Sequence, residues 1–425
     1  MTKNQLNRPF LLFIFTIICA FIISQFLKGV TLDKDKGTDE KDNLHATFYQ
    51  RAPEVINVQI SGNLSQMKYF FDGLKQARSS QVRVAHYGDS GLLGDMITSS
   101  IREDLQKVFG GSAVGFLSIT SRDIIFRATT NQSFSDDWKT VTVLTANPQN
   151  LPLGISGFVS IPQGSSWVRY ATTGWHSYLK NISTAKLFYS NAKNSSIKYS
   201  FNDGSDQYAN LKPGNEVKEL ILNVPGSGSA KSIKITATQP NQAYFYGVSL
   251  ESGNGVYIDN YPWPGDAGLG FRNIPELSLI QFNKLMNYKL IILTFGAYQA
   301  IYSSNDDRWY ENQMIKVIND LKSTFPQTSI LLIGVGDKSI KKGTKFVTDP
   351  RVSELNKLQL DIVAKTGIAF WDFFQAMGGY NSMVTWVHTN PPLGAFDYEH
   401  PTDLGAEKIG HMIAKALIDA YSNSK

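Results

Sequence analysis

Two kinds of sequence divide the chain, and this division restricts the folds that it can adopt. In the first kind, short continuous apolar runs alternate with segments in which apolar residues recur at helical spacing. The apolar runs lie at 82–87, 290–295, 330–333 and 368–371, and the helical spacing follows at 97–108, 314–321, 352–362 and 404–421. Alternating strands and helices predict a parallel sheet that helices cover on both faces.

Between residues 155 and 256, the second kind of sequence interrupts this alternation. Six short runs with strand character follow one another between Gly, Asn, Ser and Pro clusters, at 167–171, 186–189, 197–201, 219–224, 232–238 and 243–250. Strands at this spacing, without helices between them, predict an antiparallel β-sandwich. We therefore expect one α/β domain, made of residues 51–154 and 257–425, with a β-sandwich inserted at 155–256.

Composition narrows the classes of partner and of chemistry. The 425 residues carry 41 Lys and Arg against 36 Asp and Glu, a net charge of +5, and no basic block concentrates this charge. We therefore expect no nucleic-acid partner. The single cysteine, Cys19, excludes an intrachain disulfide and a cysteine-based zinc site. The six histidines show no metal-ligand spacing with carboxylates, so we expect neither a metal nor another cofactor.

The amino terminus contains a long apolar segment. Residues 10–27 carry no charged side chain, while Lys3 and Arg8 precede them and Lys28 follows. A helix of this length spans about 27 Å, which is enough to cross the hydrocarbon core of a bilayer. Because basic residues precede the segment, the rest of the chain is expected outside the cytoplasm.

We expect residues 1–30 to form an uncleaved signal anchor, a transmembrane helix, and residues 31–50 to form a polar linker. A cleaved signal peptide is the alternative, but no small-residue cleavage site follows the apolar segment. A lipoprotein signal would use Cys19, and bulky Ile18 occupies the position before it, where a small residue is expected.

Two short motifs carry side chains suited to nucleophilic catalysis. Ser90 ends a Gly-Asp-Ser motif between the first α/β strand and its helix, at the carboxyl end of the strand and beside helical N–H groups. A serine nucleophile needs a nearby base that a third group orients. Asp397 and His400, three residues apart before the last helix, can supply this pair. The alternative is that Ser90 only caps its helix and His400 is a surface residue. His86 is expected to be a packed polar residue of the core.

Around these motifs, the sequence resembles the SGNH (GDSL-like) hydrolases. Residues 86–111 look like the first block of the peptidoglycan O-acetylesterases and O-acetyltransferases of that family. The resemblance covers residues 82–112 and 257–420. It implies a three-layer α/β fold with a flavodoxin-like parallel sheet. It also implies that the inserted sandwich is similar to a carbohydrate-binding module.

The resemblance implies roles for individual residues. Ser90 is then the nucleophile, His400 the general base, and Asp397 the residue that orients His400. The backbone N–H groups of Ser90 and Gly265 are expected to bind the oxyanion of the tetrahedral intermediate, with Gly268 as the alternative to Gly265.

The third block of the family pattern is where this sequence departs. The family has Gly-x-Asn after a buried strand, whereas Tyr298 stands here in place of the Asn. Loss of one oxyanion donor costs about 10²–10³ in rate. The Tyr298 hydroxyl or the Gln299 amide can act as a substitute donor; otherwise the site is slow, altered or inactive. We expect Tyr298 at the oxyanion site, and Gln299 and Trp263 in contact with the substrate. For Trp263, burial in the core is the alternative.

Together these inferences predict an SGNH-type serine esterase that removes O-acetyl or other acyl groups from cell-wall glycan or another polysaccharide. It is expected on the periplasmic side of the inner membrane, anchored by its amino-terminal helix. One alternative is an O-acyltransferase that uses the same residues. The other is a non-catalytic glycan-binding protein, for which the Tyr298 substitution is the reason.

Overall fold

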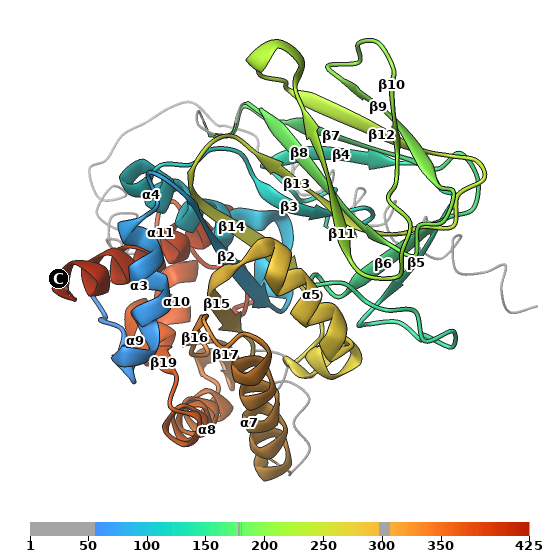
Figure 1. Cartoon of the computed structure of the whole chain (residues 1–425). Helices are drawn as coiled ribbons and strands as arrows, with labels where there is room; N and C mark the ends of the chain where they lie inside the picture. Colours follow the sequence, from blue (N-terminus) through green and yellow to red (C-terminus); the bar gives the residue numbers. More distant parts are fainter. Residues whose placement is uncertain (1–55, 122, 177–178, 180, 297–306, 425) are drawn as a thin grey trace, which may run out of the picture. The chain divides into compact units, whose positions relative to one another are not determined.

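A six-stranded sheet forms the centre of the α/β part of the chain (Figure 1). The computed structural model describes residues 56–121, 123–176, 179, 181–296 and 307–424. In spatial order the strands are β1 (Ser61–Gly62), β19 (Ala369–Trp371), β16 (Ser329–Ile333), β15 (Tyr288–Thr294), β2 (Gln81–Gly88) and β14 (Gly255–Pro262). Strands β19 to β14 are parallel, and β1 joins the edge antiparallel. From β14, the parallel strands follow the chain order 2-1-3-4-5, which confirms the flavodoxin-like prediction.

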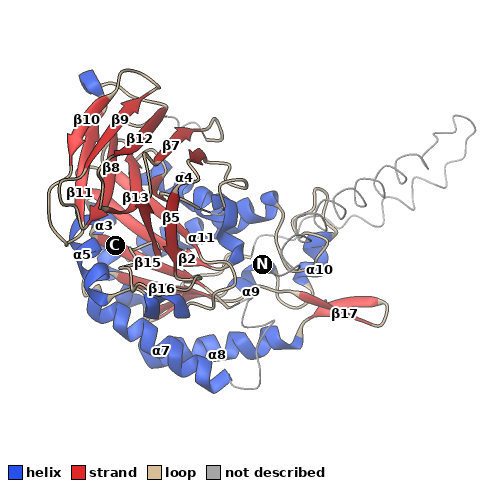
Figure 2. Ribbon diagram, turned by 90° about the vertical axis from the view of Figure 1, so that its right-hand side faces the viewer, coloured by secondary structure: helices blue, strands red, loops and turns tan. Residues whose placement is uncertain are grey.

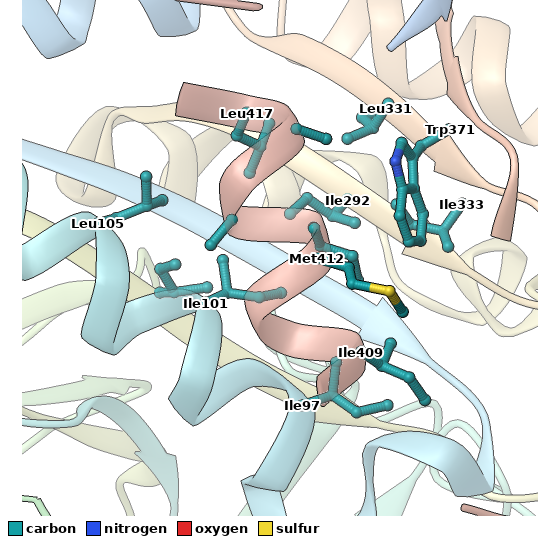
Figure 3. Packing of buried hydrophobic residues seen from close by; sticks show 14 of the residues in the cluster. Ile97, Ile101, Leu105, Ile292, Leu331, Ile333, Trp371, Ile409, Met412 and Leu417 are labelled. Atoms are coloured by element: carbon teal, nitrogen blue, oxygen red, sulfur yellow. The ribbon is translucent and has the colours of Figure 1, made fainter. Parts of the chain in front are cut away.

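Helices cover both faces of this sheet, because successive side chains of its buried strands point to opposite sides. On one face pack α3 (Lys68–Lys75), α4 (Met96–Phe109) and α11 (Asp403–Asn423), and on the other α5 (Glu276–Met286), α7 (Asp307–Thr324) and α8 (Pro350–Thr366). Figure 3 shows α4 and α11 packing apolar side chains over the strands. The predicted three layers are therefore present.

The α/β part also contains shorter elements. They are η1 (Leu64–Met67), η2 (Ser90–Asp95), η5 (Leu269–Asn273), α9 (Phe373–Met377), α10 (Ser382–Val387) and the hairpin of β17 (Ser339–Lys342) and β18 (Lys345–Thr348), while η4 (Pro225–Ser227) lies within the β-sandwich. The hairpin is clear at the side of the molecule in Figure 2.

Two antiparallel sheets form the β-sandwich between β2 and β14 (Figure 2). One has the order β10-β9-β12-β7-β4 and the other β11-β8-β13-β6-β5, with β3 also paired to β13. The strands are β3 (Gly115–Ser118), β4 (Thr130–Phe134), β5 (Trp138–Thr142), β6 (Phe158–Pro162), β7 (Trp167–Thr172), β8 (Thr184–Ser190), β9 (Ser196–Phe201), β10 (Gln207–Asn210), β11 (Lys218–Asn223), β12 (Ser232–Thr238) and β13 (Tyr244–Glu251). All six predicted runs are strands.

The sandwich begins earlier in the chain than residue 155, the predicted start. Strands β3, β4 and β5 precede that residue and belong to the two sandwich sheets. Strands β4 and β5 read TNQSF and WKTVT, so that polar residues occupy most of their positions. Such short, half-exposed strands give too little apolar periodicity to be recognised.

A buried ion-pair network joins the sandwich to the parallel sheet. Arg83 on β2 lies 2.6 Å from Glu251 Oε1 on β13 and 3.0 Å from Asp259 Oδ1 on β14. Burial opposes ionisation of Glu251, but Arg83 and Lys186 beside it lower the pKa of this carboxyl to about 2. The network thus fixes the sandwich against the sheet strands that lead to the site described below.

The predicted membrane anchor and linker, residues 1–50, lie outside the described residues, and the anchor stays a prediction. In the part of the chain that the structure describes, every helix is too short or too polar to cross a bilayer.

Candidate active site

Ser90 lies at the carboxyl edge of the parallel sheet, two residues after β2 ends at Gly88. Strand β2 lies between β14 and β15, where the strand order reverses, and ligands of doubly wound sheets bind at this point. The Asp89 N–H donates to Thr294 O on β15 over 3.3 Å. The Asp89 carboxylate accepts the Gly91 N–H over 3.0 Å and so caps η2. These bonds hold the Ser90 turn against β15.

Ser90, His400 and Asp397 form one hydrogen-bonded row. Ser90 Oγ lies 3.2 Å from His400 Nε2, and His400 Nδ1 lies 2.8 Å from Asp397 Oδ2. This is the order of nucleophile, base and orienting carboxylate. The structure thus brings together the three residues that the sequence singled out, although 310 positions separate Ser90 from His400.

The loop before α11 sets the position of His400. Asp397 Oδ1 accepts the backbone N–H groups of Glu399 over 2.9 Å and of His400 over 3.0 Å. Partial burial opposes ionisation of Asp397, but these two N–H groups and the imidazole lower the pKa of its carboxyl below the ordinary value. Thr402 then caps α11 by accepting the Gly405 N–H. One carboxylate therefore shapes the turn and orients the imidazole.

A buried ion pair supports the other side of the Ser90 turn. Gly94 and Asp95 at the end of η2 have φ of 78° and 69°, and a Cβ at Gly94 would lie 2.9 Å from Phe126 O. The fully buried Asp95 carboxylate accepts two hydrogen bonds from Arg102, of 3.0 and 3.1 Å. A further hydrogen bond comes from the Thr129 hydroxyl over 2.6 Å. The left-handed step between η2 and α4 therefore depends on glycine and on this ion pair.

His86 is a packed core residue, as expected. Its Nδ1 lies 2.9 Å from Thr98 Oγ1 and its Nε2 2.9 Å from Thr294 Oγ1. Thr98 donates its hydroxyl proton to Asn260 Oδ1 over 2.8 Å, so Thr98 Oγ1 accepts from His86 Nδ1–H. His86 Nε2 then accepts the Thr294 hydroxyl proton. Burial lowers the pKa of His86 to about 3, so the ring is neutral and positions Thr294 beside Ser90.

The turn with the predicted oxyanion glycine begins beside the Ser90 turn. Pro262 pairs with Gly88 across β14 and β2, and the Trp263 N–H donates to Gly88 O over 2.7 Å. The alternative, Gly268, donates its N–H to Asp266 Oδ1 over 2.6 Å. Within the described residues, no protein acceptor takes the N–H of Gly265. This N–H therefore remains the stronger candidate.

Of the other predicted contacts, Tyr298 and Gln299 lie outside the described residues, and the prediction for Trp263 is wrong. Trp263 is 0% exposed, and its indole N–H donates to Ser156 O over 2.9 Å. It continues the period-two pattern of β14 on the face of Tyr261, toward the core. A completely buried ring offers no surface on which a sugar can stack.

A cavity of about 110 Å³, called the apolar pocket below, opens beside Ser90 and His400. Side chains of several elements form its walls, among them Ile97, Ile333, Val352, Met383, Trp386 and Ile409. The sequence pattern does not mark these residues as a pocket, because a pocket wall and a packed core show the same apolar periodicity.

A second cavity, called the sandwich groove, has a volume of about 370 Å³. Leu93, Pro262 and Pro264 line its catalytic side, and β-sandwich residues, including Thr120, Asp136, Trp138, Thr140 and Phe158, line the other. It lies next to the Ser90 turn through Leu93 and next to Gly265 through Pro264. Its lining combines hydroxyl groups, a carboxylate and aromatic rings.

Comparisons with known proteins identify the fold. No family model and no curated protein matches the chain. A solved peptidoglycan O-acetylesterase is 19% identical over 85% of this chain and 98% of its own, with a TM-score of 0.70. A family two carbohydrate esterase from Cellvibrio japonicus is 10% identical over 70% of this chain and 99% of its own, with a TM-score of 0.28. An acetyl xylan esterase is 14% identical over 39% of this chain and 80% of its own, with a TM-score of 0.30. The chain therefore shares its fold with a peptidoglycan O-acetylesterase, in agreement with the resemblance to the SGNH, GDSL-like hydrolases.

Proposed function

We propose that this protein is a serine esterase that removes O-acyl groups, acetyl among them, from a polysaccharide. The row of Ser90, His400 and Asp397 at the switch point of the sheet is the observation that carries the proposal. Cell-wall glycan is the first substrate to test, because the similar fold belongs to a peptidoglycan O-acetylesterase. From the sequence, we place the activity outside the cytoplasm, on the periplasmic side of the inner membrane.

In the proposed reaction, Ser90 Oγ attacks the ester carbonyl while His400 Nε2 takes the hydroxyl proton. The tetrahedral intermediate then expels the sugar alkoxide, which receives that proton from His400, and an acyl-serine remains. Water attacks the acyl-serine with His400 again as the base, and the acid and free Ser90 are released. Asp397 holds the proton on His400 Nδ1, so that Nε2 can accept.

Negative charge develops on the carbonyl oxygen in both steps. The N–H groups of Ser90 and Gly265 are the proposed donors to this oxygen. Tyr298 or Gln299 as a further donor remains a prediction from the sequence.

The sandwich groove supports a polysaccharide as the substrate. Sugars present hydroxyl groups at their edges and C–H surfaces on their faces, and this groove offers hydroxyls together with Trp138 and Phe158. Because it adjoins the Ser90 turn, a glycan bound there would carry its ester toward Oγ.

The test uses the full-length chain with O-acetylated glycan and with p-nitrophenyl acetate. Wild-type protein should release acetate from both, and Ser90→Ala should reduce the rate by at least about 10³. Ser79→Ala, at an exposed turn, is the matched control and should not change the rate. Unchanged activity of Ser90→Ala would refute the nucleophile assignment. Acyl transfer to added oligosaccharide in preference to water would instead establish an acyltransferase. Glycan binding without turnover would establish a non-catalytic binding protein.

A further inference from the structure

The apolar pocket bears on which ester the site accepts. It extends from Ser90 and His400 along the carboxyl edge of the sheet, where α4 and α11 of one face and the start of α8 of the other face contribute side chains. Ile97 on α4, Ile333 on β16 and Ile409 on α11, all labelled in Figure 3, belong to its lining. Anything bound there lies within reach of the reacting oxygen.

Two polar side chains of this lining have protein partners: Asp337 Oδ2 accepts the Met383 N–H over 2.8 Å, and Lys338 lies 3.5 Å from Glu399. Asp337 Oδ1 is buried and has no hydrogen-bond partner among the described residues. Burial raises the pKa of the Asp337 carboxyl above its ordinary value despite the hydrogen bond from Met383. The Asp337 carboxyl therefore holds its proton more readily than an exposed aspartate does.

Most of this lining is apolar, so a sugar ring bound there would regain few of the hydrogen bonds to water that it loses, and each hydroxyl left unpaired costs about 1–3 kcal/mol. The hydrocarbon part of an ester loses nothing comparable and gains burial. The two halves of the proposed substrate therefore suit different sites. The sandwich groove suits the sugar, and the apolar pocket suits the acyl chain.

We propose that the apolar pocket binds the acyl chain and that its size selects acyl groups of about four carbons, longer than acetyl. This inference rests on the proposed function, because it takes Ser90 as the nucleophile. An apolar cavity of about 150 Å³ binds benzene, which corresponds to about 25 Å³ for each carbon. By this measure, the pocket of about 110 Å³ holds about four carbons. An acetyl group would leave half of it empty.

A series of p-nitrophenyl esters from acetate to octanoate tests the size of the pocket with the full-length chain. Each methylene that enters the pocket should raise kcat/KM about fourfold, so butyrate should exceed acetate by about 15-fold. Beyond six carbons kcat/KM should fall. A profile that declines steadily from acetate would overturn the inference while leaving the esterase proposal intact.

Two substitutions at one lining position test the location of the acyl chain. Val352 on α8 is buried and lines the pocket. Val352→Phe should fill the pocket and move the optimum back to acetate, whereas Val352→Ala should enlarge it and move the optimum to longer chains. The same two changes at Val317, equally buried on α7 but outside this lining, should leave the chain-length profile unchanged.

The Val352 variants must change the chain-length preference in opposite directions. If both leave the preference at its wild-type value while rates on acetate persist, the acyl chain lies elsewhere.

A binding measurement separates this inference from the chemistry. Ser90→Ala protein is titrated with vinyl acetate and vinyl butyrate, and binding is followed by protein NMR shifts. Butyrate should bind about 15-fold more tightly, and Val352→Phe in the same background should abolish the difference. Equal affinities would overturn the inference. If wild-type protein hydrolyses no ester, the proposed function fails, yet this titration still decides whether the pocket takes the chain.

Discussion

Asp397 performs two tasks with its two carboxylate oxygens. One oxygen accepts two backbone N–H groups of its own turn, and the other accepts from His400 Nδ1. The second task determines the tautomer of His400, because a proton held on Nδ1 leaves Nε2 free to accept from Ser90. A substitution that changes only the second oxygen therefore separates the two tasks.

Asp397→Asn should lower kcat by about 10²–10⁴ with little change in KM. The Asn carbonyl can still accept the turn N–H groups, whereas its NH₂ forces His400 Nδ1 to become an acceptor. The measurement is steady-state hydrolysis of an aryl ester, with the exposed Asp403→Asn as the control. A decrease of less than about fivefold would contradict this role for Asp397.

His86 should make stability depend on pH. Its pKa is about 3 in the folded protein, against an ordinary value of 6.5, because the ring is completely buried. Between these values the unfolded chain binds a proton that the folded protein does not, so stability decreases as pH falls. Wild-type protein should lose about 1 kcal/mol from pH 6 to pH 5 through this residue.

His86→Gln should reduce this pH dependence, because glutamine can bond to both threonines without titrating. The measurement is the free energy of unfolding in urea at the two pH values. Most carboxyl groups titrate below this window, so they contribute little to the difference. The same slope in His86→Gln as in wild type would assign the dependence to other groups.

At the scale of elements, the junction between η2 and α4 contains a buried charge whose stability depends on its ion pair. Asp95 has a left-handed backbone and no exposed surface, and its carboxylate is paired with the equally buried Arg102. Removing one partner of such a pair leaves an uncompensated buried charge.

Asp95→Ala should therefore destabilise the protein by about 3–5 kcal/mol, measured by urea unfolding. Combining it with Arg102→Met should cost less than the sum of the single changes, because the Arg102 charge is then removed as well and Arg127, the other buried cation beside Asp95, keeps Asp123 as its partner. The control is Asp72→Ala, which removes exposed pairs with Lys68 and Lys75 and should have little measurable effect. Additive losses in the double variant would show that the pair does not act as a unit.

At the scale of the whole molecule, the β-sandwich supplies one wall of the sandwich groove. Trp138→Ala should raise KM for acylated polysaccharide about tenfold, since a contact worth about 1.4 kcal/mol is lost. It should leave kcat/KM for a p-nitrophenyl ester unchanged. Trp175, 46% exposed on another sandwich loop, is the matched control. An effect of Trp175→Ala equal to that of Trp138→Ala would place the glycan elsewhere.

The elements that could be predicted from the sequence are those in which one local signal dominates. The buried strands and amphipathic helices of the α/β part show strong periodicity, and all of those predicted are present. Strands β4 and β5 could not be predicted, because polar residues obscure their alternation. Trp263 was expected to contact the substrate, whereas Tyr87 and Phe271 pack against its ring in the core.

By itself, the sequence determined the α/β class, the sandwich and the identity of the Ser90, Asp397 and His400 side chains. These follow from periodicity and short motifs, which are local properties of the chain. The contact between Ser90 Oγ and His400 Nε2 was decided by the tertiary structure, since strand order brings together loops 310 positions apart. The apolar pocket was decided in the same way. Apolar residues next to a void and apolar residues in a filled core have the same sequence pattern, and only packing in three dimensions distinguishes them.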